Sequence, residues 1–61
     1  MERVEEFDVV LLSDGRKGTV VEIMGDQVWF MVDIGSSPAD WETIDVDRDQ
    51  IVKVVERPEQ P

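Results

Sequence analysis

Residues 18–34 of the chain read GTVVEIMGDQVWFMVDI. Two runs rich in β-branched and aromatic residues flank Gly25-Asp26, and such runs are typical of strands. Glycine supplies the positive φ that a two-residue hairpin turn needs. Side chains after the turn alternate between two faces, one with Val28, Phe30, Val32 and Ile34 and the other with Gln27, Trp29, Met31 and Asp33. The segment therefore predicts a β-hairpin with strands over 19–24 and 27–34.

Three further strands are predicted outside this hairpin, over 7–12, 41–46 and 51–55. Polar loops separate them at 13–18 and 35–40, and residues 47–50 form a single turn. The only segment that could be helical is 1–7, which has no capping residue and little apolar face. Five short strands with tight connections can bury a shared apolar face by closing into a small barrel. The sequence therefore predicts an all-β, five-stranded barrel over 7–55.

The chain of 61 residues is long enough for one domain only. Residues 1–6 are predicted to be a charged N-terminal extension and residues 56–61 a frayed polar tail. The expected barrel core comprises Phe7, Val9, Leu11, Val21, Ile23, Val28, Phe30, Val32, Ile34, Ile44, Val46 and Ile51. This core leaves a surplus of apolar residues, which comprises Val10, Leu12, Val20, Met24, Trp29, Met31, Trp41, Val52 and Val54. Either bent strands bury some of the surplus under loops and the tail, or it forms a partner surface.

Four residues of this surplus are the candidates for partner binding: Met24, Trp29, Met31 and Trp41. Tryptophan and methionine are enriched in the cores of protein interfaces. Trp29 and Met31 lie two residues apart, on the face opposite Phe30. Trp41 is equally well explained as a loop residue that covers the mouth of the barrel. An exposed apolar patch ringed by carboxylates would bind a basic or apolar protein surface.

The composition excludes most catalytic chemistry. The chain has no cysteine and no histidine, which removes disulfides, thiolate-bound zinc and the commonest metal ligand. Nucleophilic catalysis needs a nucleophile beside a base, and Ser13, Ser36 and Ser37 have no histidine to activate them. A barrel filled by its own side chains also lacks a cleft in which paired carboxylates could act as acid and base. We therefore expect no enzyme activity and no cofactor.

The formal net charge is −9, from 15 acidic and 6 basic residues. A field of this sign repels phosphate backbones and disfavours general nucleic-acid binding. Arg16 and Lys17 are the only adjacent bases and so are the candidate for a phosphate contact. The first residues lack the apolar core of a signal peptide, and the longest apolar runs are too short for a membrane span. These features predict a cytoplasmic location without membrane contact.

Acidic residues near the C-terminus match part of a calcium-loop pattern. Asp45, Asp47, Asp49 and Glu56 occupy ligand positions 1, 3, 5 and 12 of an EF-hand. Gln50 stands where that loop needs glycine for its sharp turn, and residues 51–55 are β-like where a helix should follow. We interpret the segment as a solvated acidic turn that leads into a strand, with no metal site. Weak cation binding by these carboxylates is the alternative.

The segment DGRKGTVVEI, residues 14–23, resembles the opening of KOW-type SH3 barrels, in which a glycine loop precedes a Gly-x-Val strand. The wider pattern over 7–55 is similar to a family of small bacterial domains of unknown function. The shared features are FDVVLL at 7–12, GTVVEI at 18–23, a valine-rich third strand and a late Asp49-Gln50-Ile51. The resemblance implies an SH3-like small barrel. KOW domains often bind RNA or ribosomal and transcription proteins, and this chain departs from them in its acidic charge.

Three functions are compatible with these features. The leading hypothesis is a non-catalytic interaction module that docks on a protein partner, with its acidic rim steering it toward a basic one, or on a second copy as a homodimer. The alternative is an inhibitor whose carboxylates mimic nucleic-acid phosphates against a nucleic-acid-binding enzyme. The third is KOW-like binding of RNA or a ribosome through Arg16, Lys17 and Trp29.

Overall fold

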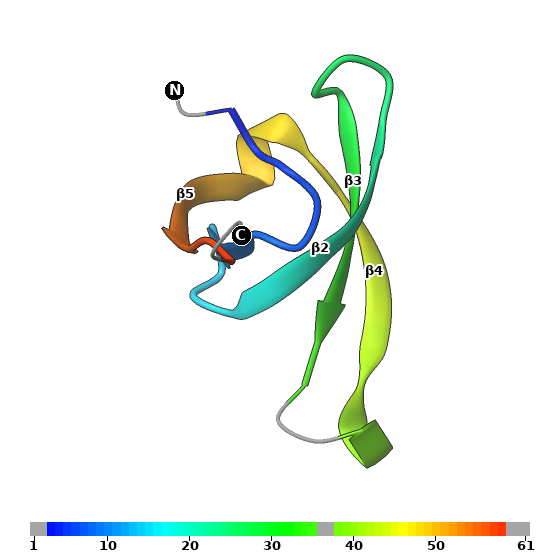
Figure 1. Cartoon of the computed structure of the whole chain (residues 1–61). Helices are drawn as coiled ribbons and strands as arrows, with labels where there is room; N and C mark the ends of the chain where they lie inside the picture. Colours follow the sequence, from blue (N-terminus) through cyan, green and yellow to red (C-terminus); the bar gives the residue numbers. More distant parts are fainter. Residues whose placement is uncertain (1–2, 36–37, 59–61) are drawn as a thin grey trace.

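The computed structural model describes residues 3–35 and 38–58 (Figure 1). Its elements are β1 (Val9–Leu12), β2 (Lys17–Met24), β3 (Trp29–Ile34), the 3₁₀ turn η1 (Pro38–Asp40), β4 (Glu42–Asp47), the 3₁₀ turn η2 (Arg48–Gln50) and β5 (Ile51–Glu56). The strands form one antiparallel sheet in the order β4-β3-β2-β1-β5. This confirms the predicted all-β, five-stranded class. The sheet has a barrel-like form that is not closed, because β4 and β5 lie at opposite ends of this order.

The turn between β2 and β3 is longer than predicted. It spans four residues, Gly25 to Val28, and β3 begins only at Trp29. Gly25 and Gln27 both have positive φ, 65° and 66°. Gln27 leaves the strand because its side chain hydrogen-bonds the backbone of Val4, which donates from its N–H at 2.8 Å and accepts at its C=O at 2.8 Å. The prediction that Val28 lies in the core is therefore wrong, and its side chain is exposed.

The core is built from one face of the curved sheet and from the segment before β1. Its buried members are Val4, Val10, Leu12, Val20, Phe30, Val32, Ile34, Val46 and Ile51, with Ile23, Ile44 and Val54 packed against them. The predicted inward face of β3 is thus confirmed from Phe30 onward. Val4 is only 1% exposed, so the segment before β1 is not simply a charged extension; residues 1–2 of the predicted extension lie outside the described residues.

The predicted inward face of β1 is wrong. Val10 and Leu12 are buried, whereas Val9 and Leu11 are half-buried on the outer face and Phe7 is exposed. The reason is Asp8, which is 0% exposed and shares the inward parity of Val10 and Leu12. A buried carboxylate is tolerated when it is paired and hydrogen-bonded, and here Arg57 pairs with it.

A β-bulge in β2 changes which side chains point inward. Val20 pairs with Val32 and Glu22 pairs with Met31, so Val21 has no partner in the register. Val20 before the bulge and Ile23 after it therefore both face the core, and Val21 is only half-buried. The prediction is wrong for Val20 and Val21 and confirmed for Ile23. A bulge inserts one residue and shifts the alternation beyond it, which a strict period of two does not anticipate.

The two terminal strands of the sheet, β4 and β5, differ in how regularly they pair with their neighbours. β4 pairs with β3 over six successive residue pairs, from Ile34↔Glu42 to Trp29↔Asp47, without a register shift. β5 pairs with β1 through two register shifts, which leave Val52 and Val55 out of the pairing and exposed.

Glu56 belongs to β5 and Arg57 is ion-paired, so the predicted frayed tail does not begin at residue 56. Residues 59–61 of that tail lie outside the described residues. Among the residues described, no helix is long or apolar enough to cross a membrane.

Candidate functional site

Three of the four predicted partner-binding residues lie together on the outer face of the sheet. Trp29 and Met31 are two residues apart on β3, opposite in direction to the buried Phe30. Met24 of β2 is the cross-strand partner of Trp29, so these two side chains share one face. Trp29 is 46% exposed and Met24 38%. We call Met24, Trp29 and Met31 the outer patch.

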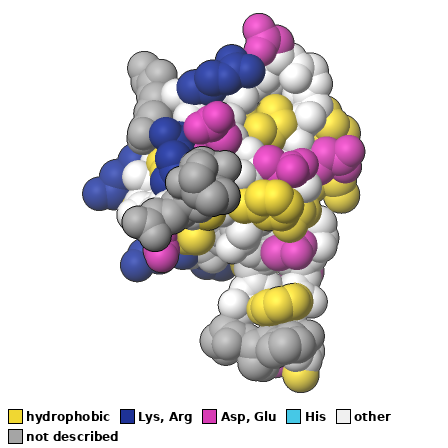
Figure 2. Space-filling model, viewed as in Figure 1, with side chains coloured by type: hydrophobic (Ala, Val, Ile, Leu, Met, Phe, Trp, Pro, Cys, Tyr) yellow, Lys and Arg dark blue, Asp and Glu magenta, His cyan; other side chains and the backbone are white. Residues whose placement is uncertain are grey.

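Carboxylates border the outer patch on both sides. Met31 pairs with Glu22 of β2 and with Asp45 of β4, and Trp29 pairs with Asp47 of β4. Directly paired residues lie on the same face, about 5 Å apart, so Trp29 and Met31 each have an acidic neighbour. Figure 2 shows hydrophobic and acidic side chains lying side by side on the β2–β4 part of the molecule. The surface therefore offers apolar contact area and negative charge at the same place.

Trp41, the fourth predicted residue, is not part of the outer patch. It precedes β4 and lies beside Gly35, at the opposite end of β3 from Trp29. Its side chain is 61% exposed and, with Val9, Lys17, Thr19 and Asp33, it lines a shallow hollow of about 340 Å³. The two tryptophans are thus separated by the length of β3, about 20 Å. The interpretation of Trp41 as a cover for the barrel mouth does not fit an indole so exposed.

The candidate phosphate contact, Arg16 and Lys17, lies among acidic groups. The Nε of Arg16 is 2.7 Å from Oδ2 of Asp14, and the hydrogen bonds from the backbone and side chain of Arg16 lower the pKa of Asp14. The hollow that Arg16 and Lys17 line also includes Asp40 and Glu42. Phosphate binding needs a cluster of bases, and these neighbours offset the charge of the pair.

The calcium-loop interpretation does not match the local structure. Asp45 and Asp47 belong to β4, Asp49 to η2 and Glu56 to the end of β5, whereas an EF-hand places its loop between helices. Asp47 instead caps η2: its side chain accepts from the N–H of Gln50 at 3.1 Å, and the side chain of Gln50 accepts from the N–H of Asp47 at 3.0 Å. In the described part of the chain no three acidic side chains are grouped so that they could hold a metal ion.

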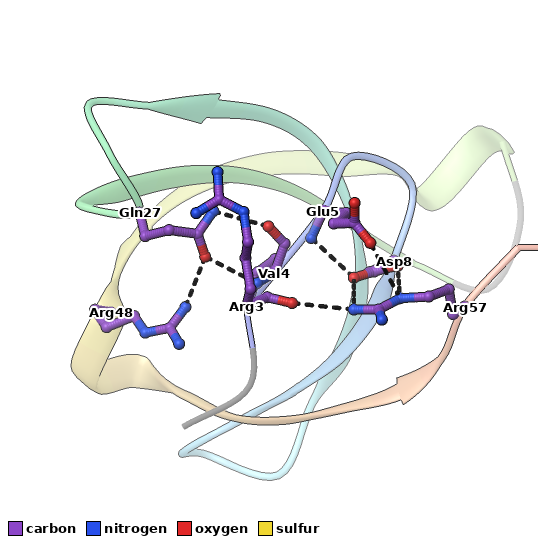
Figure 3. Close-up of polar contacts among 7 residues, drawn as sticks. All are labelled: Arg3, Val4, Glu5, Asp8, Gln27, Arg48 and Arg57. Carbon is purple, nitrogen blue, oxygen red and sulfur yellow. Dashed lines mark hydrogen bonds and ion pairs between the residues drawn. The ribbon is translucent and has the colours of Figure 1, made fainter.

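A buried polar contact that sequence reasoning missed joins the two ends of the chain (Figure 3). Arg57 donates from Nε to Oδ1 of Asp8 at 3.0 Å, from Nη2 to Oδ2 at 2.9 Å, and from Nη2 to the carbonyl of Arg3 at 3.0 Å. Oδ2 of Asp8 also accepts from the N–H of Glu5 at 2.8 Å. The Arg57 hydrogen bond is the largest cause of the lowered pKa of Asp8, and it outweighs the opposing effect of burial.

A second polar contact fixes the segment before β1 at the other side of the molecule. Gln27 bonds both backbone groups of Val4, and Arg48 donates from Nη1 to Oε1 of Gln27 at 2.9 Å. The guanidinium of Arg48 also lies 6.0 Å from the centre of the Phe30 ring. Together with Asp8, these contacts explain how Val4 is held in the core. Their role is structural, and none of these described contacts involves a residue of the outer patch.

No family model matches the sequence, and neither the curated proteins nor the solved structures include a significant match. The resemblance to KOW-type barrels and to small bacterial domains therefore stays a prediction.

Proposed function

We propose that this protein is a non-catalytic interaction module that binds a basic protein through the outer patch. The single observation that supports this proposal most is the position of Trp29 and Met31. They project from β3, which is paired on both sides, onto a face bordered by carboxylates.

A tryptophan on an inner strand is a favourable anchor for binding. The backbone of β3 is held by β2 on one side and β4 on the other, so little backbone entropy is lost when a partner binds. Tryptophan is the residue most often found as an energetic hot spot in interfaces, where its truncation costs about 2 kcal/mol or more. Met31 and Met24 beside it provide apolar surface that adapts to the shape of a partner.

The charge distribution favours a basic partner over a second copy of the chain. The net charge is −9, and the carboxylates of Glu22, Asp45 and Asp47 border the outer patch. A homodimer through this face would bring two acidic borders together, and opposed like charges are destabilising. A partner with lysine or arginine around an apolar centre would gain attraction at the same positions. We therefore assign the outer patch to a basic protein and not to self-association.

The experiment that tests the proposal compares two exposed tryptophans. The tagged chain is used to capture proteins from its native host, in parallel with Trp29→Ala and with Trp41→Ala as the matched control. A protein that depends on Trp29 and not on Trp41 is then purified and its binding measured by calorimetry. The proposal predicts a basic protein whose affinity falls by about 30-fold or more in Trp29→Ala, the equivalent of a 2 kcal/mol hot spot.

The same experiment separates the other hypotheses. A partner unaffected by Trp29→Ala, but lost when Glu22 and Asp45 become Gln and Asn and when salt is raised, would replace the proposal with phosphate mimicry. Capture of RNA that depends on Lys17 would replace it with nucleic-acid binding. Sedimentation of the purified chain tests the homodimer, and a concentration-dependent dimer that Trp29→Ala dissociates would overturn the assignment to a different protein.

A further inference from the structure

We propose that the basic partner binds as an extended strand, which pairs with the free edge of β4 and places basic side chains at alternate positions. This inference rests on the proposed function, because it specifies how the partner of the same surface is recognised. β4 lies next to the outer patch, and its Asp45 and Asp47 form one border of that patch.

The edge of β4 is regular and unpaired. β4 pairs with β3 over six successive residue pairs without interruption, and it is the terminal strand of the described sheet. In an antiparallel sheet every second residue of a terminal strand directs its N–H and C=O outward, which makes a template for another strand. Six residues, about 20 Å, match the length of an ordinary strand.

The opposite edge of the sheet is protected from such pairing. β5 changes register twice along β1, at Val55 and at Val52, and bulges bend an edge away from further pairing. Its central residue Lys53 adds a charge that blunts edges in natural sheets. β4 has no bulge, proline or lysine among its six residues. The geometry therefore selects β4 as the docking edge.

The side chains of β4 specify the chemistry of the added strand. Asp45 and Asp47 lie on the outer face, and Ile44 and Val46 point to the core. Alternate residues of an added strand would lie beside Asp45 and Asp47, where lysine or arginine is favoured. The intervening residues would lie beside Ile44, which is only half-buried, and apolar side chains there would complete its burial. The matching strand alternates basic and apolar residues.

The same charges prevent β4 from pairing with β4 of a second copy. Three of its six residues, Glu42, Asp45 and Asp47, are acidic and none is basic. Antiparallel pairing of two copies would place carboxylates opposite or diagonal to carboxylates, and like charges across strands are destabilising. An edge that repels itself and attracts a basic strand is selective for a different chain.

The test uses peptides of about seven residues, a typical strand length, added to the ¹⁵N-labelled full chain at low salt. The first peptide alternates lysine and valine, and its isomer groups the lysines and valines separately. The proposal predicts that the alternating peptide shifts the amide signals of β4, slows their hydrogen exchange and binds about tenfold tighter than the isomer. Absence of binding at millimolar concentration, or equal binding of the isomer, overturns it.

Backbone methylation gives the sharper readout, because it removes hydrogen bonds and leaves the side chains unchanged. Two versions of the alternating peptide carry N-methyl groups on the odd or on the even residues. An added strand donates hydrogen bonds to β4 only from the N–H groups of alternate residues. One methylated version should therefore lose about tenfold in affinity or more, and the other should stay within about twofold. In the protein, Asp45→Asn should weaken the alternating peptide by about fivefold, and Glu56→Gln on β5 is the matched control. Equal effects of the two methylated versions overturn strand addition.

Failure of this inference can be distinguished from failure of the proposed function. If the two methylated peptides behave alike while Trp29→Ala still abolishes binding of the captured protein, the module binds through its face and not its edge. If Trp29→Ala has no effect either, both proposals are wrong.

Discussion

Arg57 and Asp8, which are 49 residues apart in sequence, form a two-point ion pair in which Nε and Nη2 of the arginine each bond a different carboxylate oxygen. Asp8 directly precedes β1 and Arg57 directly follows β5. The pair therefore links the start of β1 to the end of β5, which are the last two strands in the sheet order. The Asp8 side chain is 1% exposed and that of Arg57 42%, so the carboxylate depends on this arginine for most of its compensation.

The first prediction concerns the loss of this pair. Arg57→Ala leaves a buried carboxylate without its cation, and we expect it to lower the free energy of unfolding by about 3 kcal/mol. Arg57→Lys keeps the charge but lacks the planar fork that donates two parallel hydrogen bonds to the carboxylate, so it should cost about half as much. Urea denaturation followed by circular dichroism measures both. Arg16→Ala is the control, because the Asp14–Arg16 pair is exposed and its loss should have a much smaller effect; equal losses for Arg57 and Arg16 would contradict the prediction.

The second prediction is a pH dependence of stability that belongs to Asp8. Its pKa is lowered in the folded chain from the ordinary value of 3.8, so the folded state binds fewer protons than the unfolded state near that pH. The contribution of Asp8 is then complete well above pH 4 and is lost as the pH falls through about 4 toward the folded pKa. The free energy of unfolding is measured between about pH 6 and pH 2.5 for the wild type and Asp8→Asn. The difference between them should shrink as the pH falls, and a constant difference would disprove the role of ionisation.

The same residue explains why part of the fold could not be predicted from sequence. The class, the number of strands and the inward face of β3 follow from alternation, because Phe30, Val32 and Ile34 alternate cleanly with polar or large outer residues. In β1 the uninterrupted run Val9 to Leu12 gives no such contrast, and Asp8 favours the wrong face when it is counted as exposed. Its burial depends on Arg57, a long-range contact that local patterns do not contain.

Only the part of the candidate site that depends on local alternation could be predicted from the sequence. Trp29 and Met31 follow from the period of β3, and the addition of Met24 needs only the β2–β3 register. The neighbours Asp45 and Asp47 depend on the pairing of β4 with β3, which sequence spacing does not fix. Residue type alone groups Trp41 with them, and the structure places it beside Gly35 instead.

The third prediction tests the close contact between β2 and β3 at Gly18. A Cβ added there would lie 2.3 Å from Cγ1 of Val32 and 2.8 Å from Cγ2 of Ile34. Gly18→Ala should therefore push these core strands apart and cost about 3 kcal/mol. Gly15→Ala is the control, because it has open space around the added atom although its φ is +93°, and it should cost about 1 kcal/mol through backbone strain. Thermal unfolding of both variants measures the difference, and a smaller effect at Gly18 would contradict the packing.

The fourth prediction separates strain from hydrogen bonding at Gln27. Its φ of 66° is unfavourable for a side chain, whereas its amide bonds Val4 on both sides. Gln27→Gly relieves the strain and removes the bonds, and Gln27→Ala removes the bonds only. We expect both to destabilise the fold, glycine by about 1 kcal/mol and alanine by about 2 kcal/mol. The denaturation midpoints of the two variants and the wild type measure these costs. A glycine variant more stable than the wild type would show that the bonds to Val4 contribute nothing to the stability of the fold.

The last prediction is that binding and folding can be separated at neighbouring residues of β3. Trp29 is 46% exposed and Phe30 0%, so adjacent side chains serve opposite faces. Trp29→Ala loses its cross-strand contact with Met24 and should cost below about 1 kcal/mol. Phe30→Ala removes the largest core side chain and should cost about 4 kcal/mol, enough to unfold a domain of this size. Circular dichroism melts of the two variants check this, and a Trp29→Ala variant that unfolds as readily as Phe30→Ala would make Trp29 a structural residue and remove it from the outer patch.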